Sequence, residues 1–201
     1  HADGEVVARC DDLVRRLVEA GAEVRDIEIP DLDAIRIAHA VTILSEMASA
    51  MSDYPDHRSS FAPATRLSLT LGRSFTGVDY LRAQRVRARA MRDFLAVFAE
   101  VDLIVTPTSA VPAPLIPADA LPAGVSDLGT VTEIMRYAIP GNLLGFPAIN
   151  VPAGYSSTGL PIGLQAMASH WREHVLLRIA NVAERLMTRR PPAVWWDLLG
   201  G

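Results

Sequence analysis

The sequence predicts an α/β fold in which helices flank a β-sheet, and three observations support this class. Apolar residues recur at helical spacing over residues 4–20 and again over residues 77–101. Short apolar runs at 102–106, 148–151 and 162–167 have the length of strands rather than of helices. The chain has 201 residues, 50% of them hydrophobic, which is enough for one sizeable core.

The first two expected elements are a helix and a strand. Residues 4–20 form the helix, and Gly21 lies where a left-handed cap would end it. Ile27 and Ile29 then alternate with charged residues, so we expect residues 23–30 to form a strand. No strand precedes the helix, although an α/β unit normally begins with one, so we expect the chain to start in the middle of such a unit.

Helices dominate the next part of the chain. Residues 33–72 are rich in Ala, Leu, Ile and Met, and their prolines suggest two or three helices. Over residues 77–101 four arginines lie opposite an apolar stripe, which predicts a solvated face. Arg87 projects to the apolar side, where an unpaired guanidinium is costly, so we expect a buried carboxylate, carbonyl or ligand partner. The four arginines are Arg82, Arg85, Arg89 and Arg92, and the stripe is Met91, Phe94, Leu95 and Phe98.

The second half of the chain combines short strands with a proline-rich stretch. Residues 102–106 are expected as a short buried strand. The prolines that follow, between residues 107 and 122, stand among apolar residues, which favours an ordered loop over the core rather than a linker. The remaining expected elements are a helix near residues 130–137, a turn-rich segment to Pro147, strands at 148–151 and 162–167, and a last helix from about Ser169 to the prolines at 191 and 192.

Composition excludes several classes of partner. The net charge of -4 argues against nucleic acid and acidic membranes, which bind clustered positive charge. The single cysteine, Cys10, lies on the apolar face of the first helix and is expected to be a core thiol. One cysteine forms no internal disulfide, and the sequence has no signal-peptide pattern and no 18-residue apolar run, so we expect a cytoplasmic protein without a membrane partner.

Four segments, taken in order, resemble the second half of the amidase-signature family, the Ser-cisSer-Lys amidohydrolases. They are residues 80–87, 102–108, 139–154 and 159–165. The Asn-Leu-x-Gly-x-Pro-Ala and Gly-Leu-Pro-x-Gly-x-Gln runs within the last two form the more specific pair. The resemblance implies a mixed β-sheet flanked by helices, with residues 1–201 forming a single unit, the C-terminal portion of an amidase domain whose N-terminal catalytic half is absent.

The resemblance also implies a catalytic apparatus that this chain lacks. In the family a nucleophilic serine is activated through a second serine, in a cis peptide, by a neutral lysine. All nineteen basic residues here are arginine, so we expect no catalytic residue in this chain, no cofactor and no hydrolysis by the chain alone. The pairs Ser59-Ser60 and Ser156-Ser157 lie outside any glycine-dense loop and are interpreted as turn residues. A Ser-His-Asp triad stays open by inventory, although no Gly-x-Ser-x-Gly elbow occurs.

The histidines raise the question of a metal site. His170 and His174 match the His-x-x-Glu-His spacing of a zinc site. We interpret the segment instead as a first helical turn in which Glu173 faces the positive end of the helix dipole, and we expect no metal. His39 and His57 have no partners in the sequence, so each is expected to be structural or exposed.

Three residues are candidates for the wall of a substrate pocket: Arg87, Thr108 and Asn142. Arg87 matches an arginine that, in amidotransferase relatives, holds a substrate carboxylate, and a structural ion pair fits equally well. Asn142 can line the pocket or hydrogen-bond nearby backbone. Glutamine-using amidotransferases carry an acidic residue where this chain has Met135, which disfavours that activity.

Three functions compete. The first is a fragment of an amidase that acts on a small-molecule amide, needs its missing N-terminal half as a partner and exposes an apolar face on which it can form a homodimer. The second is a non-catalytic binding or scaffold subunit of amidase-like fold. The third is a metallohydrolase built on His170 and His174.

Overall fold

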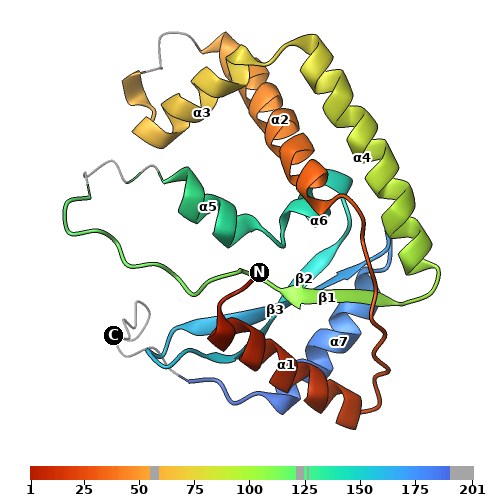
Figure 1. Cartoon of the computed structure of the whole chain (residues 1–201). Coiled ribbons are helices and arrows are strands. Elements are labelled where there is room, and N and C mark those ends of the chain that lie inside the picture. The colour runs from red at the N-terminus through yellow and green to blue at the C-terminus, as the bar shows by residue number, and fades with distance from the viewer. Residues whose placement is uncertain (55–58, 121–124, 126, 191–201) are drawn as a thin grey trace, which may run out of the picture.

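The computed structural model describes residues 1–54, 59–120, 125 and 127–190. Helices and a small sheet make up most of this part of the chain (Figure 1). The elements are α1 (Gly4–Glu19), α2 (Leu32–Ala50), the 3-10 helix η1 (Met51–Asp53), α3 (Pro63–Ser74), α4 (Gly77–Phe98), β1 (Leu103–Pro107), α5 (Leu128–Met135), α6 (Ile139–Leu144), β2 (Ala148–Tyr155), β3 (Pro161–Ala168) and α7 (Glu173–Leu186).

The sheet has three strands in the order β1-β3-β2, and both pairs are antiparallel. The α/β class is therefore confirmed, whereas the mixed pairing implied by the resemblance is not seen among the described residues. β3 is central and buried on both faces, which explains its continuous apolar run. A hairpin joins β2 to β3, with the backbone of Ser156 bonded to the carbonyl of Leu160 at 2.8 Å.

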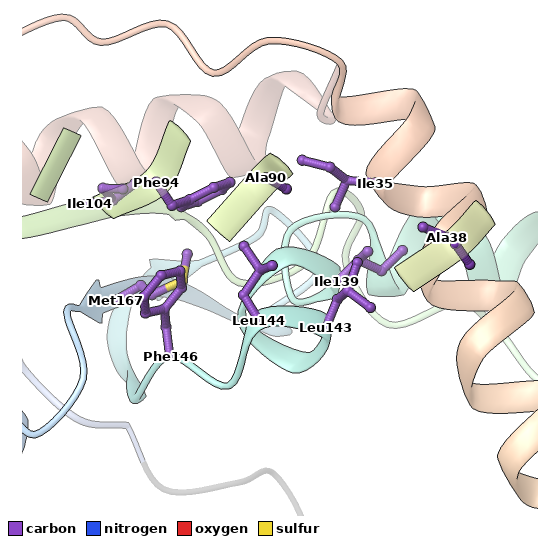
Figure 2. Close-up of a cluster of buried hydrophobic side chains, with 11 residues drawn as sticks. Ile35, Ala38, Ala90, Phe94, Ile104, Ile139, Leu143, Leu144, Phe146 and Met167 are labelled. Atoms are coloured by element: carbon purple, nitrogen blue, oxygen red, sulfur yellow. The ribbon is translucent and has the colours of Figure 1, made fainter. Parts of the chain in front are cut away.

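Helices cover both faces of the sheet. α1 and α7 pack on one face, where Leu13 and Leu17 meet Ile162 and Leu164 of β3. α4 and α6 cover the other face, and α2 packs against both of them, so that three layers result (Figure 1). Figure 2 shows the apolar core between the sheet and the helices α2, α4 and α6. In this core the ring centroids of Phe94 and Phe146 lie 5.8 Å apart.

The first helix agrees with its sequence pattern, but the strand expected after it is wrong. The buried residues of α1 are those of the apolar stripe, and Gly21 adopts the left-handed conformation with φ 101°. Residues 22–29 run extended without joining the sheet, and most of their side chains are exposed. Alternating side chains are compatible with a strand, but a strand also needs a neighbouring backbone to bond, and none of the described residues supplies one here.

The first residues of α3 and α4 explain where these two helices begin. α4 begins with a capping box, in which Thr76 and Asp79 each bond the other's backbone N–H. The four arginines of its expected solvated face are exposed, and one of them, Arg89, pairs with Asp31 at 3.2 Å. Pro63 does not break a helix but starts α3, where its missing N–H is no loss.

Two expectations about the middle of the chain are wrong. β1 is not buried: it is an edge strand, with Ile104 buried and Val105 38% exposed. The apolar loop after it lies over the core only at its start, where Ala110 is fully buried, whereas Leu115 and Ile116 are 94% and 86% exposed. An apolar side chain is buried only where an apolar surface is within reach, and the described part of this chain offers none at that place.

The C-terminal half has one more helix than expected. The segment before Pro147, expected to be rich in turns, contains the short helix α6, which ends at Gly145 with φ 75°. α7 begins at Glu173 rather than near Ser169 and ends at Leu186, while the prolines at 191 and 192 lie outside the described residues. No helix in the described part of the chain is long and apolar enough to cross a membrane.

Candidate functional site

Thr108 lies directly after β1 and is hydrogen-bonded to residues of both other strands. Its backbone N–H donates to the carbonyl of Gly163 on β3 at 2.9 Å, and its hydroxyl donates to the side-chain oxygen of Asn150 on β2. Gly163 lies between them, because a Cβ there would be 2.0 Å from the Asn150 oxygen and 2.9 Å from the Thr108 hydroxyl. The three residues therefore form one polar contact across the three strands.

Gln165 lies two residues further along β3 and is 8% exposed. Its amide nitrogen donates to the Thr106 hydroxyl at 3.2 Å and to the Tyr137 carbonyl at 3.0 Å. The hydroxyl of Tyr137 in turn donates to the carbonyl of His1 at 3.2 Å. Gln165 thus attaches the segment between α5 and α6 to the sheet, which is a structural role for the last residue of the Gly-Leu-Pro-x-Gly-x-Gln run.

Arg87 lies in a row of polar side chains between α2 and α4. Arg87 is half-buried, and its guanidinium donates to the side-chain amide oxygen of Gln84 at 3.4 Å, while the side-chain nitrogen of Gln84 donates to the Thr42 hydroxyl at 2.9 Å. One turn earlier, Tyr80 donates to Glu46 at 2.8 Å, and this hydrogen bond raises the pKa of the tyrosine. The partner of Arg87 is therefore a part-buried side-chain amide of its own helix, and the described residues provide no carboxylate within ion-pair distance of it.

Asn142 lies on α6 and its side chain is exposed. Its backbone N–H donates to Ala138 at 3.1 Å inside the helix, so the residue belongs to a helix rather than to the approach of a tight turn. No hydrogen bond joins Arg87, Thr108 and Asn142 to one another in the described part of the chain. The sequence did not predict the contact of Thr108 with Asn150. The signal that could have indicated it is Asn150 itself, a polar residue in a strand of the sheet.

In the part of the chain that the structure describes, the histidines lie apart from one another or lack a third metal-binding neighbour. His170 lies before α7 begins, its ring nitrogen is 3.3 Å from the Leu144 carbonyl, and its ring lies 4.5 Å from that of Phe146. His174 is exposed on the first turn of α7. Among the described residues no group of three metal-binding side chains occurs. His39 is buried, which lowers its pKa, and His57 lies outside the described residues.

Neither serine pair lies in a catalytic arrangement in the described structure, and Ser156 is buried within a turn. The Ser156 hydroxyl accepts from the backbone N–H of Leu160 at 3.0 Å and lies 2.8 Å from the Thr158 hydroxyl, so it stabilises the β2-β3 turn. Ser59 and Ser60 are exposed. Neither pair is hydrogen-bonded to a histidine in the described structure, so no activated nucleophile is formed here.

Cys10 is a core thiol, as its place in the helical stripe predicts. It is 4% exposed, and its sulfur lies 3.6 Å from the Gly163 carbonyl oxygen. Burial, with a smaller contribution from Asp11, raises its pKa to about 11. A thiol with that pKa is protonated at neutral pH, which excludes it as a nucleophile.

Comparisons with known proteins agree with this arrangement. The family model described as Amidase matches residues 1–177. The chain is 43% identical to a fatty acid amide hydrolase of Medicago truncatula over 201 residues, which is 98% of this chain and 33% of that protein. It is 33% identical to a glutamyl-tRNA(Gln) amidotransferase subunit of Akkermansia muciniphila, over 82% of this chain and 40% of that protein.

Solved structures show the same fold. A crystal structure of an amidase superimposes with a TM-score of 0.80 at 23% identity and covers 93% of this chain and 43% of that one. A 6-aminohexanoate cyclic dimer hydrolase gives a TM-score of 0.74 at 22% identity, over 92% of this chain and 42% of that one. The chain spans about a third of the length of the plant relatives that it matches.

Proposed function

Since this chain belongs to the amidase family, we propose that it is the C-terminal portion of an enzyme that hydrolyses carboxylic amides to acid and ammonia or amine. The observation that carries this proposal is the match over residues 1–177 together with the fold shared with solved amidases. The reaction proceeds by acyl transfer, in which a nucleophile attacks the amide carbonyl and the acyl-enzyme is then hydrolysed.

The base for this reaction lies outside the chain. Acyl transfer needs a nucleophile, a group that removes its proton, and donors that stabilise the oxyanion. The sequence contains no lysine, and its serine pairs stabilise turns or lie exposed. The chain by itself is therefore inactive and depends on the part of the amidase that it does not contain.

This chain contributes part of the pocket that surrounds the substrate. Arg87 and Asn142 supply donors from α4 and α6, and Thr108 supplies a hydroxyl at the end of β1. Arg87 is half-buried and makes one long hydrogen bond to a neutral amide, so its charge is available for a polar group of the substrate. These roles follow from residue chemistry and position, and substitutions of Arg87 and Asn142 test two of them.

The substrate class is a fatty acid amide. Support comes from four plant proteins named fatty acid amide hydrolase, which are 38–43% identical over 98% of this chain. The amidotransferase relatives are less similar, at 33% and 30% identity. A cytoplasmic location is part of the same proposal.

The test replaces the matched third of the Medicago truncatula enzyme with this chain and measures release of oleic acid from oleamide. The chimera should hydrolyse the amide, whereas the 201-residue chain alone should not. In the chimera, Arg87→Gln and Asn142→Ala should raise KM, while the exposed Arg85→Gln serves as the control. A folded chimera that releases no acid would favour the non-catalytic scaffold, and hydrolysis by the chain alone would disprove the dependence on a further segment.

A further inference from the structure

The contacts between α2 and α4 include a row of polar side chains. The two helices pack side by side (Figure 1). Tyr80 on α4 donates to Glu46 on α2 at 2.8 Å. One turn further along α4, Gln84 donates to Thr42, which lies one turn before Glu46 on α2. The helices therefore run antiparallel here, and residues four apart on each helix share the face that carries the row. Arg87 follows Gln84 on the same face of α4 and extends the row.

Arg87 has no negatively charged partner in the part of the chain that the structure describes. Its guanidinium donates to the side-chain oxygen of Gln84 at 3.4 Å, which is a long hydrogen bond to a neutral group. No described carboxylate lies within ion-pair distance of it. A half-buried guanidinium forms its strongest hydrogen bonds with charged or strongly polar groups. The row therefore leaves donors of Arg87 available.

Glu46 is the acid of α2 and α4 that belongs to this row. These helices contain three other acids, each committed elsewhere or on another face. Asp33 is paired with an arginine of its own helix, and Asp79 caps the start of α4. Asp93 comes six residues after Arg87, a spacing that places it on a different face of the helix. A carboxylate from these two helices that pairs with Arg87 would therefore be that of Glu46.

Tyr80 controls where the Glu46 carboxylate lies. Tyr80 and Arg87 are seven residues apart, about 10 Å along the axis of α4. Long helical side chains point toward the N-terminus, so the guanidinium leans toward Gln84 and the tyrosine. The hydrogen bond with Glu46 raises the pKa of Tyr80, and the charge of Arg87 lowers it by a smaller contribution. The guanidinium is therefore near enough to attract the carboxylate, which the Tyr80 hydroxyl holds apart from it.

We propose that Tyr80 is a positioning residue of the substrate pocket, because its hydroxyl holds Glu46 and thereby keeps the Arg87 guanidinium free for a polar group of the substrate. Gln84 completes the arrangement. It is a neutral amide anchored on the buried Thr42, so it orients the guanidinium without neutralising its charge. A carboxylate paired with Arg87 would occupy the donors that the substrate needs. The inference rests on the proposed function, which assigns Arg87 to the pocket.

Kinetics in the Medicago truncatula chimera test the effect on the substrate. Tyr80→Phe should raise KM for oleamide about tenfold with a smaller change in kcat, because the released Glu46 pairs with Arg87. Adding Glu46→Gln should restore KM to within about twofold of the parent value. Tyr155→Phe on β2 is the matched control and should leave KM unchanged. An unchanged KM in Tyr80→Phe, or a raised KM that Glu46→Gln does not restore, would overturn the inference.

A double-mutant cycle in the 201-residue chain tests the position of Glu46 without any activity. With Tyr80 intact, Glu46→Gln and Arg87→Gln should change Tm additively, because the two side chains are not paired. In Tyr80→Phe the same two changes should be coupled by about 1–3 °C, because an ion pair has formed. Coupling with Tyr80 intact, or no coupling without its hydroxyl, would refute the inference.

The two experiments separate this inference from the proposed function. If the parent chimera releases no acid while the cycle shows the expected coupling, the proposed activity is contradicted and the positioning of Glu46 by Tyr80 is supported. If the parent chimera is active and the cycle shows no coupling in Tyr80→Phe, the proposed function is supported and the inference is wrong.

Discussion

Replacing Gly72 with alanine tests how closely α3 packs on α2. Gly72 is buried, and a Cβ at this position would lie 2.1 Å from the backbone oxygen of Leu44 and 3.1 Å from the Cβ of Ala48. Ordinary contacts begin at 3.4 Å, so the two helices must separate by more than an ångström. The atom in the way belongs to the backbone of a helix, so a side-chain rotation does not relieve the overlap.

Two opposing contributions set the change in the free energy of unfolding that Gly72→Ala causes. Overpacking costs about 1–3 kcal/mol, and the better helix propensity of alanine returns about 1 kcal/mol. Because the overlap involves backbone, we take the upper part of the range and expect a net loss of about 1–2 kcal/mol. For a chain of this length, that corresponds to a decrease in Tm of about 2–8 °C.

The assay is thermal unfolding followed by circular dichroism, with limited proteolysis between α3 and α4 as a second readout. Gly77→Ala is the matched control, because no atom lies within 4 Å of its added Cβ, and it should change stability by no more than about 0.5 kcal/mol. If Gly72→Ala were as stable as the parent chain or more so, α3 would not pack on α2 as described.

Three further predictions concern buried groups. The raised pKa of Cys10 means that folding favours its protonated form, so its contribution to stability is complete below pH 9.0 and is lost as pH rises to about 11. Urea unfolding at a series of pH values should show this loss of unfolding free energy. The Cys10→Ala variant should not show it. The pKa of His39 is lowered by burial, so its contribution to stability is present above pH 6.5 and is lost as pH falls through the pKa of the folded state. In His39→Gln the decline in Tm below pH 6.5 should therefore be smaller. An unchanged decline would show that protonation of buried His39 does not destabilise the fold. Gln165→Leu leaves the Thr106 hydroxyl and the Tyr137 carbonyl without their donor, so urea unfolding should show a loss of about 1–3 kcal/mol.

The candidate site was predicted in part. The sequence identified the strand that precedes Thr108, but not the contact of the Thr108 hydroxyl with Asn150 across Gly163. It predicted a partner for Arg87, which is Gln84 three residues earlier on the same helix. Contacts within a helix follow from spacing, whereas the contact between β1 and β2 depends on a strand register that no local pattern encodes.

The sequence by itself determined the longer helices, except for the exact start of the last one, the α/β class and the absence of a lysine, because periodicity and composition can be read from the chain itself, whereas the short helix α6 was not expected. The tertiary structure decided which extended segments became strands. Residues 23–29 and β1 both have strand-like sequences, yet β1 pairs with β3 while residues 23–29 stay unpaired. A strand is stabilised by hydrogen bonds to another backbone, so its formation depends on a partner that lies elsewhere in the chain or outside it.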